Sequence, residues 1–283
     1  MRQLTDIAHQ RQAAAILIEL TSAFEGIAST KIAQVKDQVQ RSEKFFADLW
    51  QIYNQIRIDK QFHFGRGGNI KLINKELMIL ITSESSFSGD IDQRLVAQAL
   101  MDYKSEANDI VVIGRHGAVQ LLQAGVGFAR TYTLPESEQN INVEPLVNEV
   151  QKYVSTIVYY QSYMSLMNQA VKTIKLGTAV ERLSAKVKPG AEIITEANYI
   201  FEPSPHAVID HLERSMMQIA LSEVILESKL AQYASRFRAM RMAHEKADDS
   251  YTDFNRLYAH AKRHIKDERL KELLNNLRGG NQL

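Results

Sequence analysis

The positions of proline and glycine constrain this chain more than any other feature of its sequence. All five prolines lie between residues 135 and 205, only Gly26 precedes Gly65, and no glycine or proline lies between His206 and Arg278. Because proline costs a helix interior about 3 kcal/mol and glycine about 1 kcal/mol, both ends of the chain are predicted to be long helices. At 1.5 Å per residue they would reach about 90 Å and 110 Å, whereas a small domain is about 30 Å across.

Both terminal stretches also carry a repeat of 3.5 residues. From Ile209 to Ile265, fifteen of seventeen positions in this repeat are apolar, aromatic or alanine, and from Ile7 to Ile56 eleven of fifteen are. A sustained repeat of this kind is typical of a left-handed coiled coil. Two helices of an ordinary bundle are the alternative, but such helices average three or four turns. We therefore expect the two ends to pair as an antiparallel coiled coil.

The middle of the chain has a different pattern. Short apolar runs at 77–82, 109–113, 128–134, 155–163 and 171–176 predict strands, and helices are expected from Asp90, as the N-cap, to about Tyr103 and over 118–124. Strands that alternate with helices favour a Rossmann-like parallel α/β domain. The predicted domains are therefore an N-terminal helix (1–64), an inserted α/β domain (65–203) and a C-terminal helix (204–283).

The motifs of nucleotide binding and catalysis are missing. Gly125-Val126-Gly127 lacks the third glycine of G-x-G-x-x-G, no Walker motif occurs, and Gly65 to Gly68 is interpreted as the end of the first helix. The serines at 85, 86 and 88 have no nucleophile elbow around them and are interpreted as a turn. We expect no catalytic residue and no cofactor.

Metal and nucleic-acid sites are not expected either. The chain has no cysteine, and His260 and His264 have no third ligand at a compatible spacing. The formal net charge is only +1, which argues against a surface built to neutralise phosphates. The basic cluster Arg236, Arg238 and Arg241 lies on a helix of mixed charge and suits an acidic protein partner better than DNA.

Several segments together resemble the gamma subunit of F-type ATP synthases. Tyr199 to Pro205 (YIFEPSP) is similar to the family's Y-x-Y-E-P-x-P, and Ala234 to Met240 (ASRFRAM) to A-x-R-M-x-A-M. Leu20 to Ile32 (LTSAFEGIASTKI) resembles I-T-x-A-M-x-x-V-A-x-x-K, with Phe24 in place of methionine. Glu84 to Asp92 (ESSFSGDID) stands where the family has D-R-G-L-C-G-x-x-N. The resemblance extends over nearly the whole chain.

This resemblance implies a function and a set of contact residues. The function is that of a rotor shaft that couples proton or sodium flow to ATP chemistry on beta subunits, without catalysis on this chain. Contacts with the ring of alpha and beta subunits are implied for Phe24, Arg236, Arg238, Leu273 and Leu277, and contacts with the c-subunit ring for Tyr199 and Glu202. The family's grip positions are substituted here, by Ala259, Lys262, Lys266, Asp267 and Arg269.

The resemblance also implies an epsilon subunit as partner and a peripheral position on the cytoplasmic side of the cell membrane. The chain itself is expected to be soluble, because its longest early apolar run, Ala13 to Ile18, is far shorter than a bilayer span. The rival hypothesis is a coiled-coil scaffold whose α/β insert recruits a protein partner without rotation. The apolar face of Leu270, Leu273, Leu274 and Leu277 favours the rotor.

Overall fold

A computed structural model describes residues 2–56, 72–84, 87–133, 141–184, 202 and 204–279. The chain divides into two units, which we describe separately. The coiled-coil unit comprises residues 1–27 and 237–283, and the packed unit comprises residues 28–236. Helices α1 (Arg2–Ile56) and α6 (Pro205–Gly279) each contribute to both. Helix α1 is described as far as Ile56, and its predicted end at residue 64 lies outside the described residues.

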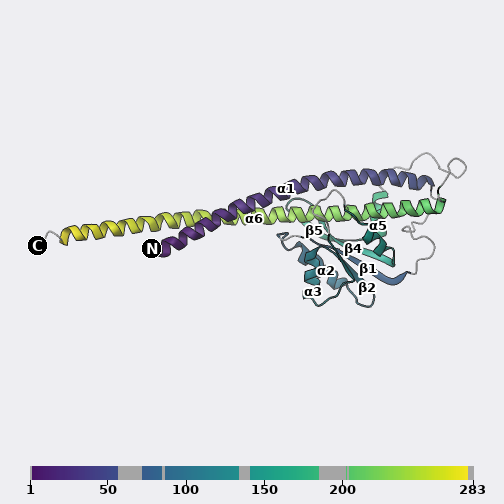
Figure 1. Ribbon diagram of the computed structural model, residues 1–283, viewed down its shortest axis with the longest axis horizontal. Helices are drawn as coiled ribbons and strands as arrows, with labels where there is room; N and C mark the ends of the chain where they lie inside the picture. Colours follow the sequence, from purple (N-terminus) through teal and green to yellow (C-terminus); the bar gives the residue numbers. More distant parts are fainter. Residues whose placement is uncertain are drawn as a thin grey trace. The chain divides into compact units, whose positions relative to one another are not determined.

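In the coiled-coil unit, α1 and α6 run antiparallel (Figure 1). Arg11 contacts Asn255, and Thr21, further along α1, contacts His244, which lies earlier on α6. Every predicted seam position between Ile7 and Ile265 in this unit is buried or half-buried, whereas most of the residues between them are exposed. The 3.5-residue repeat therefore identified the contact face correctly, and the predicted fold class is confirmed.

The packed unit contains a five-stranded sheet with the order β3-β2-β1-β4-β5. Its strands are β1 (Ile73–Ile81), β2 (Asn108–Ile113), β3 (Arg130–Tyr132), β4 (Tyr153–Tyr163) and β5 (Gln169–Lys175). The first four are parallel, as predicted, but β5 is antiparallel to β4. The prediction of an all-parallel sheet was wrong at this edge, because residues 164–168 form a short hairpin and leave no room for a crossover helix.

Side chains alternate between the two faces of the sheet. Met78 and Leu80 of β1 belong to a cluster with α2 (Ile91–Asp102) and α3 (Arg115–Gln123). Leu77 and Ile79 point the other way, into a larger cluster with α4 (Glu144–Val150), α5 (Leu176–Ser184), α1 and α6. Helices α4 and α5 were not predicted, because each is only two turns long and α5 begins within the apolar run that was interpreted as a strand.

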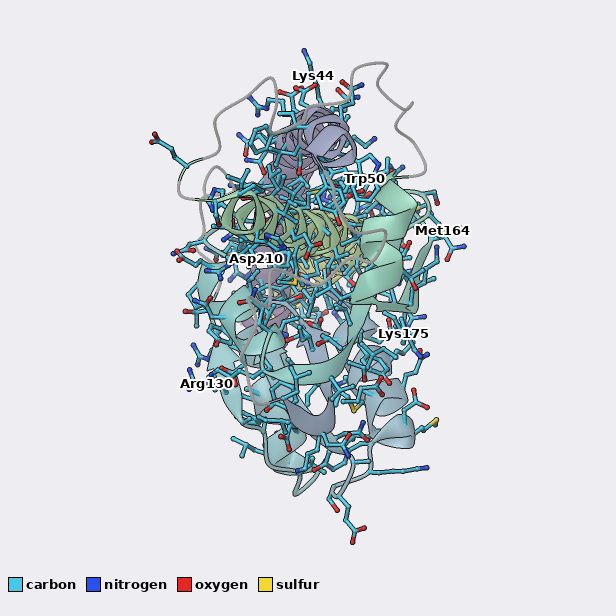
Figure 2. The ribbon with its side chains drawn as sticks, turned by 90° about the vertical axis from the view of Figure 1, so that its right-hand side faces the viewer. Lys44, Trp50, Arg130, Met164, Lys175 and Asp210 are labelled. Carbon is cyan, nitrogen blue, oxygen red and sulfur yellow. The ribbon has the colours of Figure 1, made fainter. Side chains whose placement is uncertain are left out.

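Helix α6 forms the centre of the packed unit. Viewed end-on, α6, with Asp210, lies between α1, with Trp50, and the strands (Figure 2). Between Leu212 and Ser235 only Arg214 is exposed. The hydroxyl of Tyr53 on α1 donates to Oε1 of the fully buried Glu213 at 2.8 Å. This part of α6 is therefore a core helix with neighbours on both sides.

The turn after β1 differs in one detail from the prediction. Helix α2 begins after Asp90, as expected, but the Asp90 side chain makes no capping hydrogen bond. Its carboxylate lies 3.2 Å from Nε of Arg94 instead. The carboxylate that organises this turn is that of Asp92, which the sequence did not single out.

Candidate functional site

Helix α1 has a second apolar face in the coiled-coil unit, besides its seam. The apolar residues of this face are between 37% and 54% exposed, and from Leu17 onward they recur three or four apart: Ile16, Leu17, Leu20, Phe24 and Ile27. By length and composition alone, an 18-residue window of α1 within Leu4–Tyr53 would qualify as a membrane span, with a mean hydropathy of 1.2, which is weak evidence for one. Contiguous exposed apolar surface of this kind marks an interaction site. We call these five residues the α1 stripe.

The seam beside this stripe contains several polar contacts. The guanidinium of Arg11 lies 4.5 Å from the ring centre of Tyr258, and the hydroxyl of Thr21 lies 3.3 Å from Nδ1 of His244. Exposed ion pairs on α6, such as Arg241 with Glu245, join residues of that helix to one another. Such pairs contribute little to stability because both side chains are solvated. Packing along the seam therefore contributes most to holding the two helices together.

The C-terminal part of α6 continues beyond the first residues of α1 (Figure 1). Leu270, Leu273 and Leu274 are 56%, 60% and 57% exposed, and Leu277 lies on α6, but its side chain is outside the described part. The five substituted grip positions all have exposed side chains. Where the helices part, a groove of about 460 Å³ is lined by Leu4, Ile7, Leu257, His260, Ala261, His264, Ile265 and Glu268.

The structure distributes the predicted contact residues over both units. Phe24, Arg238 and Leu273 belong to the coiled-coil unit, where Phe24 is 37% exposed and Arg238 is half-buried. Arg236 and Glu202 belong to the packed unit, and Glu202 is exposed. Tyr199 lies outside the described residues.

The half-buried Arg236 has a distinct environment at the end of the packed unit. Its guanidinium lies 5.6 Å from the ring centre of Tyr233. Burial lowers the pKa of Arg236, and the charges of Tyr233 and Asp92 act in the opposite direction. An arginine has so high a pKa that it stays charged here.

A polar cluster that the sequence analysis missed lies at the carboxyl ends of β1 and β4. Its centre is Asp92, which is only 2% exposed. The carboxylate of Asp92 accepts hydrogen bonds from the backbone N–H of Ser83 (3.2 Å), the hydroxyl of Ser88 (3.1 Å) and Nε2 of Gln161 (2.8 Å). It also lies 3.2 Å from Nδ1 of His116. A buried carboxylate is tolerated when donors surround it in this way.

Two glycines at the start of α3 allow this cluster to form. Gly114 has a φ of 98°, and a Cβ there would lie 2.1 Å from the carbonyl oxygen of Thr82. A Cβ on Gly117 would lie 2.7 Å from the Thr82 side chain. The β2–α3 turn therefore packs directly on the end of β1, which brings His116 next to Asp92.

The cluster occupies the place where open α/β sheets bind ligands. The strand order reverses between β1 and β4, and ligands of such sheets bind outside the carboxyl ends of the strands at this point. Here the hydroxyl of Ser228 and Nε2 of Gln232, both on α6, donate to Oε1 of Gln161. Buried side chains of α6 thus pack against this edge of the sheet. Among the described residues, no group of three or more His, Cys, Asp or Glu is arranged to hold a metal ion.

The fold defines a class of protein, in which an antiparallel two-helix coiled coil has an α/β domain inserted in the sequence between its helices. The model of a family described as ATP synthase matches residues 3–272. The chain is 25% identical over 271 residues to the ATP synthase gamma chain of Chlorobium phaeobacteroides (strain BS1), with 88% of each chain covered. It is 23% identical to that of Clostridium novyi (strain NT), with 93% of this chain and 92% of the relative covered. The chain belongs to the family of ATP synthase gamma subunits.

Solved structures share the fold. A chain in the mitochondrial ATP synthase of Euglena gracilis, solved with OSCP, F1 and c-ring, aligns with a TM-score of 0.64 at 12% identity, covering 99% of this chain and 97% of that one. A chain of the central stalk and c-ring structure from Tetrahymena thermophila mitochondrial ATP synthase aligns with a TM-score of 0.56 at 16% identity, covering 79% and 99%.

Proposed function

We propose that this chain is the central rotor shaft of an F-type ATP synthase and couples ion flow through the membrane sector to ATP synthesis or hydrolysis on the beta subunits. The observation that carries the proposal is the uneven chemistry around the coiled-coil unit. Helix α1 presents the apolar α1 stripe, whereas α6 presents charged side chains such as Lys262, Lys266 and Asp267. Each subunit around such a shaft meets a different face as the shaft turns, which makes equivalent catalytic subunits inequivalent.

This function requires no reaction on the chain itself. ATP chemistry belongs to the beta subunits, and the present chain is a non-catalytic subunit that supplies torque and asymmetry. The switch point of the sheet supports this assignment, because Gln161, Ser228 and Gln232 at that place are buried and hydrogen-bonded to one another.

The bearing contacts with the alpha and beta subunits are assigned to Phe24, Arg236, Arg238, Leu273 and Leu277. Exposed apolar side chains suit a bearing, because apolar contact is not directional and holds the shaft at no single angle. The exposed leucines Leu270, Leu273 and Leu274 at the end of α6 have this character.

The remaining partners follow from the family. Tyr199 and Glu202 are assigned to contacts with the c-subunit ring, and the epsilon subunit is a further partner. The named neighbours support the two main partners, since their structures include F1 and c-ring components. The complex places this chain at the membrane as a peripheral subunit, on the cytoplasmic side in a bacterial cell.

The rival hypothesis of a non-rotary scaffold has no observation in its favour. The family match runs from residue 3 to residue 272 and so includes both long helices as well as the α/β domain. A scaffold that kept only a coiled coil would not need this complete combination.

Co-expression with the alpha and beta subunits of the same genome tests the proposal. The complex is purified through a tag on beta, its stoichiometry is determined by mass spectrometry, and ATP hydrolysis is assayed. One copy of this chain per three beta subunits, with hydrolysis that depends on it, is expected. Three copies, or an active ring that forms equally well without it, would contradict the rotor.

Variants at the end of α6 test the bearing contacts separately. Leu273→Ser is expected to weaken retention of the chain in the ring, because it removes exposed apolar surface. Lys271→Ser is the matched control, since Lys271 is also exposed on α6 but contributes no apolar contact. Equal retention of the two variants would contradict a contact between Leu273 and the alpha and beta subunits.

A further inference from the structure

The polar cluster at Asp92 continues directly into the long helix α6. One arm runs from Asp92 through Gln161 on β4 to Ser228 and Gln232 on α6. Ser228 is fully buried, and Gln161 is too. The arm therefore connects the sheet with α6 through side chains that water does not reach.

A second arm joins the turn after β1 to the buried Ser235, which lies seven residues after Ser228 on α6. The hydroxyl of Ser235 on α6 donates to the backbone carbonyl of Ser88 at 2.6 Å, and Ser88 itself donates to Asp92. The turn lies close to the helix here, since a Cβ on Gly89 would lie 3.3 Å from the Ser235 hydroxyl. A third contact joins the hydroxyl of Ser162 to Oε1 of Glu227 at 2.8 Å.

These contacts differ in kind from the apolar packing around them. Apolar contact is proportional to buried area and has no preferred direction, so it does not by itself prevent a helix from turning in its socket. Hydrogen bonds are directional and weaken steeply when the donor moves off line. Buried polar networks also resist partial breakage, because each group left without a partner costs free energy.

We propose that the network of Asp92, Ser88, Gln161, Ser228, Gln232 and Ser235 transmits torque between α6 and the α/β domain. It fixes the rotational position of α6 against the carboxyl ends of β1 and β4, and Asp92 is the positioning residue that orients Ser88 and Gln161. The inference rests on the proposed rotor function, because only a shaft under load needs this contact to resist twisting.

The test measures torsional stiffness in the assembled complex. The chain has no cysteine, so Met101→Cys, at a position 85% exposed on α2, provides a single attachment point for a bead on the α/β domain. With the alpha–beta ring immobilised and the complex stalled, the variance of the bead's angle reports the stiffness between ring and domain. In a first measurement, the complex with the unsubstituted network must rotate the bead during ATP hydrolysis. If it does not rotate, the proposed function fails, whatever the variants do.

The decisive variant is Ser228→Ala with Ser235→Ala. Both changes suit a helix and leave volume nearly unchanged, but they remove the hydroxyls that join α6 to Gln161 and Ser88. Ser155→Ala is the matched control, since its hydroxyl donates to Glu76 within the sheet and does not reach α6. The angular variance is expected to rise severalfold in the double variant and to stay unchanged in the control.

Other results overturn the proposal. An unchanged variance in the double variant would show that the Ser228 and Ser235 hydroxyls do not fix the rotational position of α6. An equal rise in the Ser155→Ala control would show general loosening of the domain. If the double variant does not assemble, the single variants Ser228→Ala and Ser235→Ala are measured in the same way. A variant that assembles less well but shows no rise in variance once assembled would also contradict the proposal, because a torque-transmitting contact affects stiffness and not assembly.

Discussion

The two halves of helix α6 face different environments although they belong to one continuous helix. Between Leu212 and Ser235 it is buried on nearly every side, whereas after Met240 most of its residues are exposed and the seam positions are the main exceptions. The polar groups of a buried helix need hydrogen-bond partners. Ser228 and Gln232 have theirs on β4, and Ser235 has its partner in the turn after β1. The half after Met240 packs through a single seam, so its other polar side chains can be hydrogen-bonded by water. Its remaining surface is available for partners.

The largest expected effect separates the two halves by the cost of truncating a leucine. Leu221→Ala in the packed unit should lower the free energy of unfolding by about 2–5 kcal/mol, because Leu221 is fully buried and leaves a cavity. Leu257→Ala in the coiled-coil unit should change it by about 0.5 kcal/mol or less, since Leu257 is 53% exposed. Denaturant unfolding followed by circular dichroism measures both. Equal costs would remove the distinction between a core helix and a rod helix.

The glycines give the next largest contrast, with opposite signs in the two units. Gly114→Ala in the packed unit should cost about 1–3 kcal/mol, because its backbone conformation suits glycine and a Cβ would contact the Thr82 carbonyl. Gly26→Ala in the coiled-coil unit should stabilise the chain by about 1 kcal/mol, because Gly26 lies within α1 and a Cβ there meets nothing within 4 Å. Thermal unfolding of the two variants measures the difference. A stabilising Gly114→Ala would contradict the close packing of the β2–α3 turn.

The smallest effect on stability is expected at the α1 stripe. Leu17→Gln with Leu20→Gln should change the free energy of unfolding by about 0.5 kcal/mol or less, because both side chains are about half exposed. Binding to the alpha–beta ring should nevertheless weaken, which pull-down through tagged beta measures. Glu19→Gln, an exposed change between them, is the control and should leave binding unchanged. A double variant that binds normally would mean that the α1 stripe makes no contact in the complex.

Local patterns in the sequence were sufficient to predict much of this fold. The 3.5-residue repeat identified the seam, and short apolar runs located all five strands to within a few residues. The family resemblance was confirmed by a match over residues 3–272. These features depend on spacing along the chain, which the sequence displays directly.

The features that were missed depend on residues far apart in the sequence. Asp90 was interpreted as the residue that caps α2, but Asp92 is the buried carboxylate, and its partner Gln161 lies 69 positions away. The direction of β5 depends on a hairpin at residues 164–168 that has no strong turn signature. The Ser228 and Ser235 hydroxyls gave no signal either, because a serine on a helix is usually solvated.

The continuity of α6 from Pro205 to Gly279 also restricts how such a chain can change in length. Removing or adding one residue within it would shift every later seam residue off the 3.5-residue repeat, and the α1 partners would then face polar positions. Only a change of a whole heptad, about seven residues, restores the pattern. Insertions and deletions in descendants of this sequence are therefore expected in the connections of the α/β domain, where length is not tied to register.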